Sequence, residues 1–484
     1  MSISAALSNA LTGLSAAGRA GAVVSSNVAN VMTEGYARRE ISLSAQSLGG
    51  QGAGVRVNGV GRVVNPPVLR ERRAADAEAG NWQAQSAFLT RIESMIGEPG
   101  AEGSLSGRLA RFESSLIEAQ SRPDSTARLQ SVLIAAQDLA STVNGIGRSI
   151  QEARSEADSS IEAQVGQLNA DLARGDELNA EITAMRSLGR DANGLLDQRQ
   201  TLVDRIAAIV PVREVPRENE QIALYTTGGA VLLEGNPARI GFSPVGVITA
   251  DMAIGSAALS GLTINGMPIR PTDDGPLGGG TLGAAFAVRD ALAPALQADI
   301  DAVARDLVTR FEASGIDPTR APGDPGLLTD AGAVFDPLTE TGLAGRLEVN
   351  ALADPARGGA LWRLRDGLGA TVPGAVGDAS LLAALHTAVT EQQPTQSGSL
   401  AGVSRTAFGF AADLLSRTAT QRGAAEDRLA FSSGRQAALK ELQMQDGVDT
   451  DAEMQKLLLV EQAYAANARV IQTMDDLITQ LIGL

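Results

Sequence analysis

The chain of 484 residues has no cysteine, one histidine and few aromatic residues. The absence of cysteine excludes disulfides, thiolate nucleophiles and metal sites with cysteine ligands, and it is compatible with a protein that works outside the cell without cross-links. The single histidine, His386, excludes metal sites rich in histidine. Phenylalanine, tyrosine and tryptophan make up only 3% of the residues, so aromatic stacking platforms for bases are scarce.

Charge and hydropathy exclude further classes of partner. The formal net charge of −16 argues against long-range attraction to nucleic acid or to an anionic membrane. No apolar run approaches the ~20 residues that are needed to cross a bilayer, so we expect no membrane partner. The first basic residue is Arg19, so the positively charged start of a secretory signal is missing, and export would need another route.

The sequence contains no specific signal for a catalytic or cofactor site. A Ser/His/Asp triad would depend on His386, which lies in the alanine- and leucine-rich run 381–389, where a structural role is favoured. The glycine clusters at 49–54 and 278–280 lack the Lys-Ser/Thr pair that binds phosphates and fit no dinucleotide fingerprint, so they indicate turns. The acidic residues at 317–330 lack the spacing of a calcium loop. We therefore expect no catalytic residue, no metal and no cofactor.

Proline marks where long helices are possible. It is absent from 1–65, 124–210 and 395–484. Helical spacing also covers 68–97 and 286–311. Within the helical region 122–209, a predicted inner face consists of Ile161, Val165, Leu168, Leu172, Leu178, Ile182 and Met185. This pattern indicates a helical bundle.

Between these helical regions the pattern changes. From 212 to 283, short apolar runs alternate with turn signals such as Asn265-Gly266, which predicts a small β domain inserted into the helical one. Residues 49–64 are predicted to form short extended pieces that end at Pro66-Pro67. Residues 316–395 are predicted to be irregular, with a possible short strand at 347–350.

The expected fold class is therefore α+β and multidomain, with terminal coiled-coil helices and a helical bundle that carries an inserted β domain. A chain of this length is long enough for about three domains. The terminal helical domain is expected at 1–66 and 446–484. The helical bundle is expected at 67–211, 284–315 and 396–445, the β domain at 212–283, and an irregular segment at 316–395.

The two ends of the chain share a pattern of residues that recur at alternating gaps of three and four. This is the period of helices that pack along one seam. At the N-terminus the predicted seam is Ile3, Leu7, Ala10, Leu14, Ala17, Gly21, Val24 and Val28. At the C-terminus it is Leu457, Val460, Tyr464, Asn467, Ile471, Met474, Ile478 and Leu481. Each end is predicted to be a helix that needs a helical partner.

What those partners are stays open. Residues 1–33 contain one charged side chain, Arg19, and a helix of this composition is typically buried between several neighbours. Ala10, Ala17 and Gly21 would let two backbones approach closely. The alternative is a local antiparallel pair of the two ends, lying on the core of the same chain.

A helix stop follows the first seam, in the segment Ala29-Asn30-Val31-Met32-Thr33-Glu34-Gly35-Tyr36. Asn30 and Gly35 can adopt left-handed backbone angles, and Tyr36 can anchor the chain as it becomes extended. The segment resembles the signature shared by axial proteins of the bacterial flagellum, which are the rod, hook and hook-associated proteins. The family has proline before Gly-Tyr, where this chain has Glu34, but Asn30, Gly35 and Tyr36 match its motif.

Two further stretches resemble the hook-associated members of that family. The first is Asn193-Gly194-Leu195-Leu196-Asp197-Gln198-Arg199, in which Leu195, Leu196, Asp197, Gln198 and Arg199 form the motif of the junction between hook and filament. The second runs from Gly447-Val448-Asp449 through 461–473. The resemblance covers both ends and the central helical region, whereas 212–395 match only in general character.

The resemblance implies a structural, non-enzymatic component at the junction between hook and filament. It implies a ring or tube of identical subunits whose terminal helices form the inner tube, in contact with the hook protein and a second junction protein. It also implies an extracellular location, export by the flagellar type III apparatus without a cleaved signal, and an export chaperone at the C-terminal helix.

The seams then become the predicted assembly interface, which would become ordered on assembly. We predict that packing is carried by Ile3, Leu7, Leu14, Val24, Val28, Leu457, Val460, Tyr464, Ile471, Met474, Ile478 and Leu481, with Asn467 setting the register. Two alternatives remain. A hook or rod protein would share 30–36 but not the run 195–199. A secreted binding protein or hydrolase with a helical stalk would need a polar pocket within 212–395.

Overall fold

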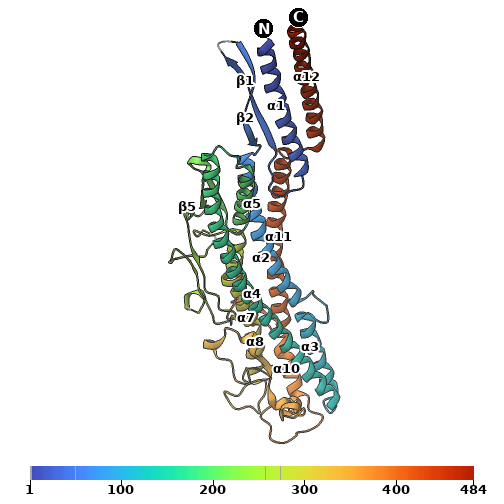
Figure 1. Cartoon of the computed structure of the whole chain (residues 1–484). Helices are drawn as coiled ribbons and strands as arrows, with labels where there is room; N and C mark the ends of the chain where they lie inside the picture. The colour runs from blue at the N-terminus through green and yellow to red at the C-terminus, as the bar shows by residue number, and fades with distance from the viewer. Residues whose placement is uncertain (1–2, 49–50, 257, 273, 400, 484) are drawn as a thin grey trace. The chain divides into compact units, whose positions relative to one another are not determined.

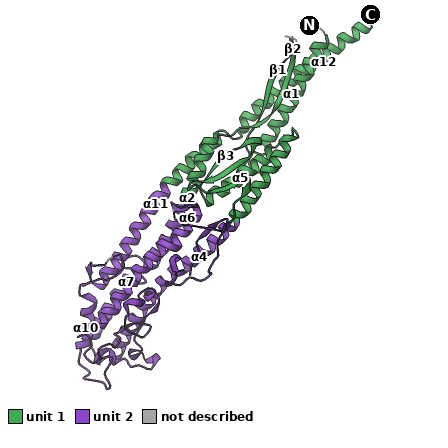
Figure 2. Cartoon of the chain, turned by 90° about the vertical axis from the view of Figure 1, so that its left-hand side faces the viewer, with its two compact units in different colours: residues 1–78, 167–239, 431–484 green, residues 79–166, 240–430 purple. Residues whose placement is uncertain are grey.

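The computed structural model describes residues 3–48, 51–256, 258–272, 274–399 and 401–483 (Figure 1). The chain is an α+β protein with two compact units (Figure 2). Unit 1 comprises residues 1–78, 167–239 and 431–484, and unit 2 comprises residues 79–166 and 240–430. Gly49 and Gly50, which belong to the first predicted glycine turn, lie outside the described residues.

Unit 1 contains both ends of the chain. It holds helices α1 (Ile3–Ala29), α5 (Asn193–Ile209) and α12 (Thr450–Ile482), and parts of α2 (Pro66–Ile96), α4 (Thr126–Ser187) and α11 (Ala407–Gln445). Its strands are β1 (Arg39–Leu48), β2 (Gln51–Arg62), β3 (Val212–Pro216), β4 (Ile222–Thr226), β5 (Val231–Glu234) and β6 (Asn236–Pro237), with a single 3-10 turn at Glu218–Glu220 among the described residues. Strands β1 and β2 form an antiparallel ribbon, and β3–β4–β5–β6 form a separate antiparallel sheet.

Unit 2 contains the remaining parts of α2, α4 and α11. Its other helices are α3 (Leu105–Ser121), α6 (Gly280–Ala287), a π turn (Val288–Leu292), α7 (Ala293–Glu312), α8 (Leu343–Arg346), α9 (Arg363–Asp366) and α10 (Ser380–Thr390). Its strands are β7 (Ile240–Gly241), β8 (Leu262–Ile264), β9 (Met267–Ile269), β10 (Leu328–Asp330), β11 (Leu347–Val349), β12 (Gln393–Pro394) and β13 (Ser404–Arg405). Its 3-10 turns are Ile254–Ser256, Pro337–Thr339, Ala351–Ala353 and Pro355–Arg357.

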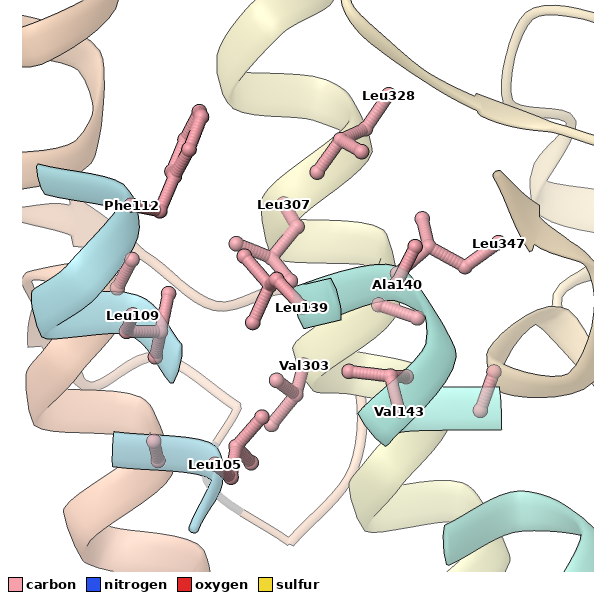
Figure 3. Close-up of a cluster of buried hydrophobic side chains, with 14 of the residues drawn as sticks. Leu105, Leu109, Phe112, Leu139, Ala140, Val143, Val303, Leu307, Leu328 and Leu347 are labelled. Carbon is pink, nitrogen blue, oxygen red and sulfur yellow. The ribbon is translucent and has the colours of Figure 1, made fainter. Parts of the chain in front are cut away.

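The apolar core of unit 2 lies between α3, α4 and α7 (Figure 3). Leu109 of α3, Leu139 of α4 and Leu307 of α7 are each at most 1% exposed. The rings of Phe112 and Phe311 meet edge to face with their centroids 6.1 Å apart. Such a core is typical of helices that bury one apolar stripe each.

Several local predictions are confirmed. The region 122–209 is helical, but α4 ends at Ser187 and α5 begins at Asn193, with Gly189 in a left-handed conformation (φ 65°) between them. The inner face from Ile161 to Ile182 is buried, and Met185 is half-buried. Asn265 and Gly266 both have positive φ and connect β8 to β9, as a two-residue hairpin turn requires.

The region 212–283 does not form one inserted β domain. Strands β3–β6 belong to unit 1, where Asn179 of α4 donates to the carbonyl of Ile222 (3.0 Å). Strands β7–β9 belong to unit 2, where Asp158 of α4 accepts from the backbone N–H of Val245 (2.7 Å). The region is divided because its two sheets are attached to different stretches of the same long helix.

The segment 316–395 is also more ordered than its prolines suggested. It contains the predicted strand at β11, which pairs with β10, and the helix α10. Helix α10 buries Leu382 and Leu385 in the core of unit 2, and this packing explains why an alanine- and leucine-rich run is helical here. None of the helices in the described part of the chain combines the length and the apolarity that a bilayer crossing requires.

Candidate assembly site

The first and last helices of the chain, α1 and α12, lie side by side in unit 1 (Figure 1). The amide Nδ2 of Asn27 donates to Oε2 of Glu453 (3.0 Å). Further along, Gly21 lies against Val460 and Gly13 lies against Asn467. Because residue numbers rise along α1 as they fall along α12, the two helices are antiparallel. The two ends of the chain therefore pair with one another, as in the second arrangement left open by the sequence, but the core of the chain does not cover the pair as that arrangement supposed.

Small residues allow this close approach. A Cβ atom on Gly13 would lie 2.7 Å from Oδ1 of Asn467. Asn467 also donates from Nδ2 to the carbonyl of Ala463 (2.9 Å) within its own helix. Gly13 therefore leaves the space that the Asn467 side chain occupies.

Most predicted seam residues are only partly covered by this pairing. Ala10, Ala17 and Val24 are buried, whereas Tyr464 and Leu481 are 47% and 62% exposed. The half-buried seam residues are Ile3, Leu7, Leu14, Gly21, Val28, Leu457, Val460, Asn467, Ile471, Met474 and Ile478. Of the predicted seam, Gly21 and Val460 meet across the helix pair and Asn467 lies against Gly13, whereas Tyr464 and Leu481 are left exposed.

A second group of apolar side chains on the terminal helices lies outside the predicted seam. We call Leu11, Leu458, Leu459, Leu477 and Ile482 the outer apolar group, and they are 50%, 57%, 65%, 40% and 81% exposed. The single-seam interpretation missed these residues. The run Leu457-Leu458-Leu459 was the available signal, because three consecutive residues of a helix cannot face the same partner.

Asn27 holds the lower end of the helix pair together. It is fully buried and its amide makes four hydrogen bonds, which is all that the group can make. Nδ2 donates to the carbonyl of Arg39 (2.9 Å) and to Glu453 (3.0 Å), while Oδ1 accepts from the N–H of Arg39 (2.8 Å) and from the hydroxyl of Tyr36 (2.9 Å). Glu453 is itself 1% exposed and accepts from Lys456 (2.7 Å). No pattern in the sequence distinguishes Asn27, because α1 contains other polar residues such as Asn9 and Ser26.

The motif at 30–36 forms the turn after α1. Gly35 is left-handed as predicted (φ 77°), and a Cβ atom there would lie 2.1 Å from Oγ1 of Thr201. Asn30, which can adopt left-handed angles, does not use them here, because the described non-glycine residues with positive φ are Asn219, Glu220, Asn265 and Ala331. Asn30 instead completes the helix end with its side chain, which donates to the carbonyl of Ser26 (2.9 Å) and accepts from the hydroxyl of Thr33 (3.2 Å).

The chain that directly follows the motif at 30–36 meets the motif at 195–199 at Asp197. This side chain of α5 forms ion pairs with Arg39 and with Nε of Arg62 (2.8 Å), and it accepts from the backbone N–H of Ala37 (3.3 Å). Arg39 begins β1 and Arg62 ends β2, and the two are directly opposite in the ribbon. Two like charges at such a position repel one another. Asp197 therefore neutralises a repulsion at the base of the ribbon and attaches that base to α5.

Burial changes the pKa of two arginines in this region, Arg62 and Arg199. Burial lowers the pKa of Arg62, and the charge of Asp197 opposes that effect. Burial also lowers the pKa of Arg199, whose NH1 donates to Oδ1 of Asn179 (3.0 Å) and to the carbonyl of Glu220 (2.6 Å). Of the other junction-motif residues, Leu195 and Leu196 are half-buried and Gln198 is exposed. Asn193 attaches α5 to the ribbon by donating to the carbonyl of Val60 (2.8 Å).

The ribbon also contacts α1 along its length. The backbone N–H of Val55 donates to Oγ1 of Thr12 (3.2 Å), and Gly54 lies against the same side chain with φ 100°.

Elsewhere in the chain, Nε2 of His386 lies 3.5 Å from Oε1 of Glu113. Within the described ranges, no group of three histidine, cysteine, aspartate or glutamate residues is arranged to hold a metal ion.

Three family models match this chain. The model "Flagellar hook-associated protein FlgK helical domain" matches residues 89–326. The model "Flagella basal body rod protein" matches residues 7–36, which include most of α1 and the turn after it. The model "Flagellar basal body rod FlgEFG protein C-terminal" matches residues 445–484, which include α12.

Curated relatives agree with these models. Flagellar hook-associated protein 1 of Bacillus subtilis (strain 168) is 27% identical over 240 residues, which are 47% of this chain and 47% of the Bacillus protein. Flagellar hook-associated protein 1 of Salmonella typhimurium is 28% identical over 244 residues, which are 49% of this chain and 44% of the Salmonella protein. The chain thus spans about half the length of the curated relatives it matches.

A solved structure, that of the flagellar hook junction protein FlgK from Burkholderia pseudomallei, is similar with a TM-score of 0.45 and 19% identity over 54% of this chain and 47% of that one. The paired terminal helices and the turn at 30–36 are the parts matched by the rod models, so the chain is a flagellar axial protein. Within this class, the helical-domain model and the curated relatives point to the hook-associated proteins. Together these matches support the identification of the chain with flagellar hook-associated protein 1.

Proposed function

We propose that this chain is a structural component of the flagellum that forms the junction between hook and filament. The role requires no catalytic residue, metal or cofactor. Its support is the helical-domain match over 89–326 and the two relatives whose name is flagellar hook-associated protein 1. The partners we propose are identical subunits in a ring or tube, the hook protein and a second junction protein.

The observation that carries this proposal is the exposed apolar surface of the paired terminal helices. Helix α12 has 33 residues, of which Glu453 is buried, and α1 covers only one side of it. The outer apolar group remains at least 40% exposed. A helix that exposes apolar side chains on more than one side, at several turns, is typically buried between several neighbours. We infer that neighbouring subunits cover this surface.

The energy available from such contacts is considerable. Fully burying a leucine side chain contributes roughly 1.5–3 kcal/mol. Leu459 is 65% exposed, so covering it would contribute about 1–2 kcal/mol at a subunit contact. A heterologous contact repeats around a ring or along a tube, and each repeat adds the same contribution. The terminal helices are thus suited to assembly by many identical contacts.

The seam has a different proposed role from the outer apolar group. Its residues from Ile3 to Val28 and from Leu457 to Leu481 pack α1 on α12, and we propose that assembly covers the parts that remain exposed. Asn467, which lies against Gly13, is proposed to set the register of the pair. We further propose that the chain is exported by the flagellar type III apparatus without a cleaved signal, with a chaperone on the C-terminal helix, and acts outside the cell.

The test compares two exposed leucines. Leu459→Ser removes a leucine of the outer apolar group, whereas Leu338→Ser removes a leucine that is 93% exposed in a turn of unit 2. Because neither side chain is buried in the chain, we expect both variants to keep the thermal stability of the wild type. We expect Leu459→Ser alone to reduce incorporation into flagella and swimming in a strain that lacks the natural protein. Normal incorporation of Leu459→Ser would contradict the proposal.

A hook or rod protein is the main alternative. The rod models match the ends of the chain at 7–36 and 445–484, whereas the hook-associated model matches 89–326, which favours the junction role. Electron microscopy of a strain without the chain separates the two roles. Complete hooks without attached filaments support the junction, whereas missing hooks would support a hook or rod protein.

A secreted hydrolase or binding protein needs a polar pocket with available functional groups. Unit 2 has a cavity of about 340 Å³ lined by Arg305, Asp306 and Gln393, among others. Its charged groups are engaged, because Arg305 donates to Glu340 (2.9 Å) and Asp306 accepts from Arg310 (2.6 Å). This cavity therefore gives no specific reason to prefer a catalytic function.

A further inference from the structure

A cavity of about 310 Å³ lies within unit 1, next to the motif at 195–199. Its lining includes four arginines, Arg62, Arg70, Arg73 and Arg199, and one carboxylate, Glu214. Arginines at this density are unusual in a chain with a net charge of −16. The cavity is therefore basic although the protein as a whole is acidic.

Two of the arginines have carboxylate partners. Arg73 donates to Asp204 (2.6 Å) and to Glu214 (2.7 Å), so its charge is neutralised. Arg62 shares Asp197 with Arg39, so one carboxylate serves two guanidinium groups. Asp204 also pairs with Arg72, so these carboxylates leave no negative charge in excess over the arginines that they serve.

The other two arginines have no carboxylate partner among the described residues. Arg199 is 8% exposed and donates to the neutral oxygens of the Asn179 side chain and the Glu220 backbone, while the carboxylate of Glu220 pairs with Arg186 (2.9 Å). Arg70 is exposed and makes no ion pair within the described part of the chain. The carboxylate of Glu214 attracts Arg199 but is hydrogen-bonded to Arg73, and a nearly buried guanidinium without a counter-charge of its own is costly because its hydration has been lost. An anion in the cavity would remove that cost.

The rest of the lining indicates what kind of anion fits. Leu69, Leu196 and Val203 line the same cavity and are apolar. A planar guanidinium binds a carboxylate or a phosphate through two parallel hydrogen bonds. The apolar side chains would contact hydrocarbon, which an inorganic phosphate does not have. We propose that the cavity binds a carboxylate carried on a short aliphatic chain.

Such a carboxylate has two possible sources with the same chemistry. One is a free aliphatic acid, and the other is an aspartate or glutamate side chain of a second copy of this chain, which has 56 acidic residues. A carboxylate from a second copy requires the proposed self-assembly, whereas binding of a free acid does not. Substitutions in the cavity leave the outer apolar group intact, so failure of the anion site can be distinguished from failure of the proposed junction function.

The experiment is a calorimetric titration of the purified full-length chain with succinate, against sodium chloride at equal ionic strength. We expect saturable binding to the wild type. Arg70→Met should weaken it about fivefold, because one charge near a partly exposed ligand contributes about 1 kcal/mol. Arg199→Lys should weaken it further, because lysine has no two-pronged donor. Glu214→Gln should strengthen it, because the lining then loses its carboxylate.

The matched control is Arg213→Met. Arg213 precedes Glu214 on β3, so its side chain leaves the opposite face of the strand, and it does not line the cavity. We expect no change in succinate binding from this substitution, although it removes the same charge as Arg70→Met. Circular dichroism checks that each variant is folded. If Arg199→Lys is not folded, Arg70→Met still tests the site, because Arg70 is exposed and its substitution should leave the fold intact.

Sedimentation at increasing protein concentration then identifies the source. If succinate and Arg70→Met both reduce self-association, a second copy supplies the carboxylate. If succinate binds without changing self-association, the ligand is a free acid. The absence of saturable binding, or equal binding by Arg70→Met, Arg199→Lys and the wild type, would overturn the proposal.

Discussion

Asp197 is the charged attachment of the β ribbon to α5, beside the amide contact of Asn193, and replacing it with asparagine tests the arrangement. Asp197 lies between two arginines that are directly opposite one another in β1 and β2. Asparagine has nearly the same shape and can still accept from the N–H of Ala37, but it carries no charge. The substitution therefore leaves Arg39 and Arg62 facing each other without a counter-charge.

The expected magnitude follows from the burial of the three side chains. Arg39, Arg62 and Asp197 are 9%, 14% and 13% exposed, so water screens them poorly. Removing one partner of a buried ion pair costs 3–5 kcal/mol, whereas an exposed pair is worth about 0–1 kcal/mol. For a site that is slightly open to solvent, we expect the lower end of the buried range, about 3 kcal/mol.

Amide hydrogen exchange at residues 39–62 measures this cost locally. A loss of about 3 kcal/mol lowers the protection of the ribbon by about two orders of magnitude. The control is Asp413→Asn, which breaks the pair with Arg405, because those side chains are 29% and 46% exposed. It should change protection near α11 by less than about fivefold. Similar small effects for both variants would refute the reasoning that Asp197 anchors the ribbon.

Two further predictions concern backbone conformation and pH. Gly35→Ala should lower the free energy of unfolding of unit 1 by about 2–3 kcal/mol, because alanine is strained at φ 77° and its Cβ would overlap Thr201. The control is Gly18→Ala, whose Cβ meets open space on α1 and which should be neutral or stabilising. Chemical denaturation measures both variants. In unit 2, burial raises the pKa of Asp301 to about 6 from an ordinary value of 3.8. The folded state then holds the proton more tightly than the unfolded state, so the free energy of unfolding should fall by at most about 3 kcal/mol as pH rises from 4 to 7. Asp301→Asn should lose that component of the pH dependence, and an unchanged slope in denaturation curves would exclude Asp301 as its source.

Local patterns predicted most of the secondary structure. The alternating gaps of three and four at both ends predicted α1 and α12, because helical periodicity is a property of neighbouring residues. Asn265-Gly266 predicted the turn of the β8–β9 hairpin for the same reason, since the conformational freedom that the turn needs belongs to those two residues. The division of 212–283 between two units was not predictable in this way, because it depends on which part of α4 each sheet contacts.

The sequence by itself determined the terminal helices, the helix stop at 30–36 and the resemblance at 195–199, because each depends on a few adjacent residues. Only the tertiary structure decided that the segment after the helix stop meets the motif at 195–199, with Asp197 bound to Arg39 across a separation of 158 residues. It also decided that Asn27 joins α1, β1 and α12, and that the outer apolar group stays uncovered. The physical reason is that ion pairing, full use of an amide's hydrogen bonds and burial are relations between distant segments, which periodicity and composition do not contain.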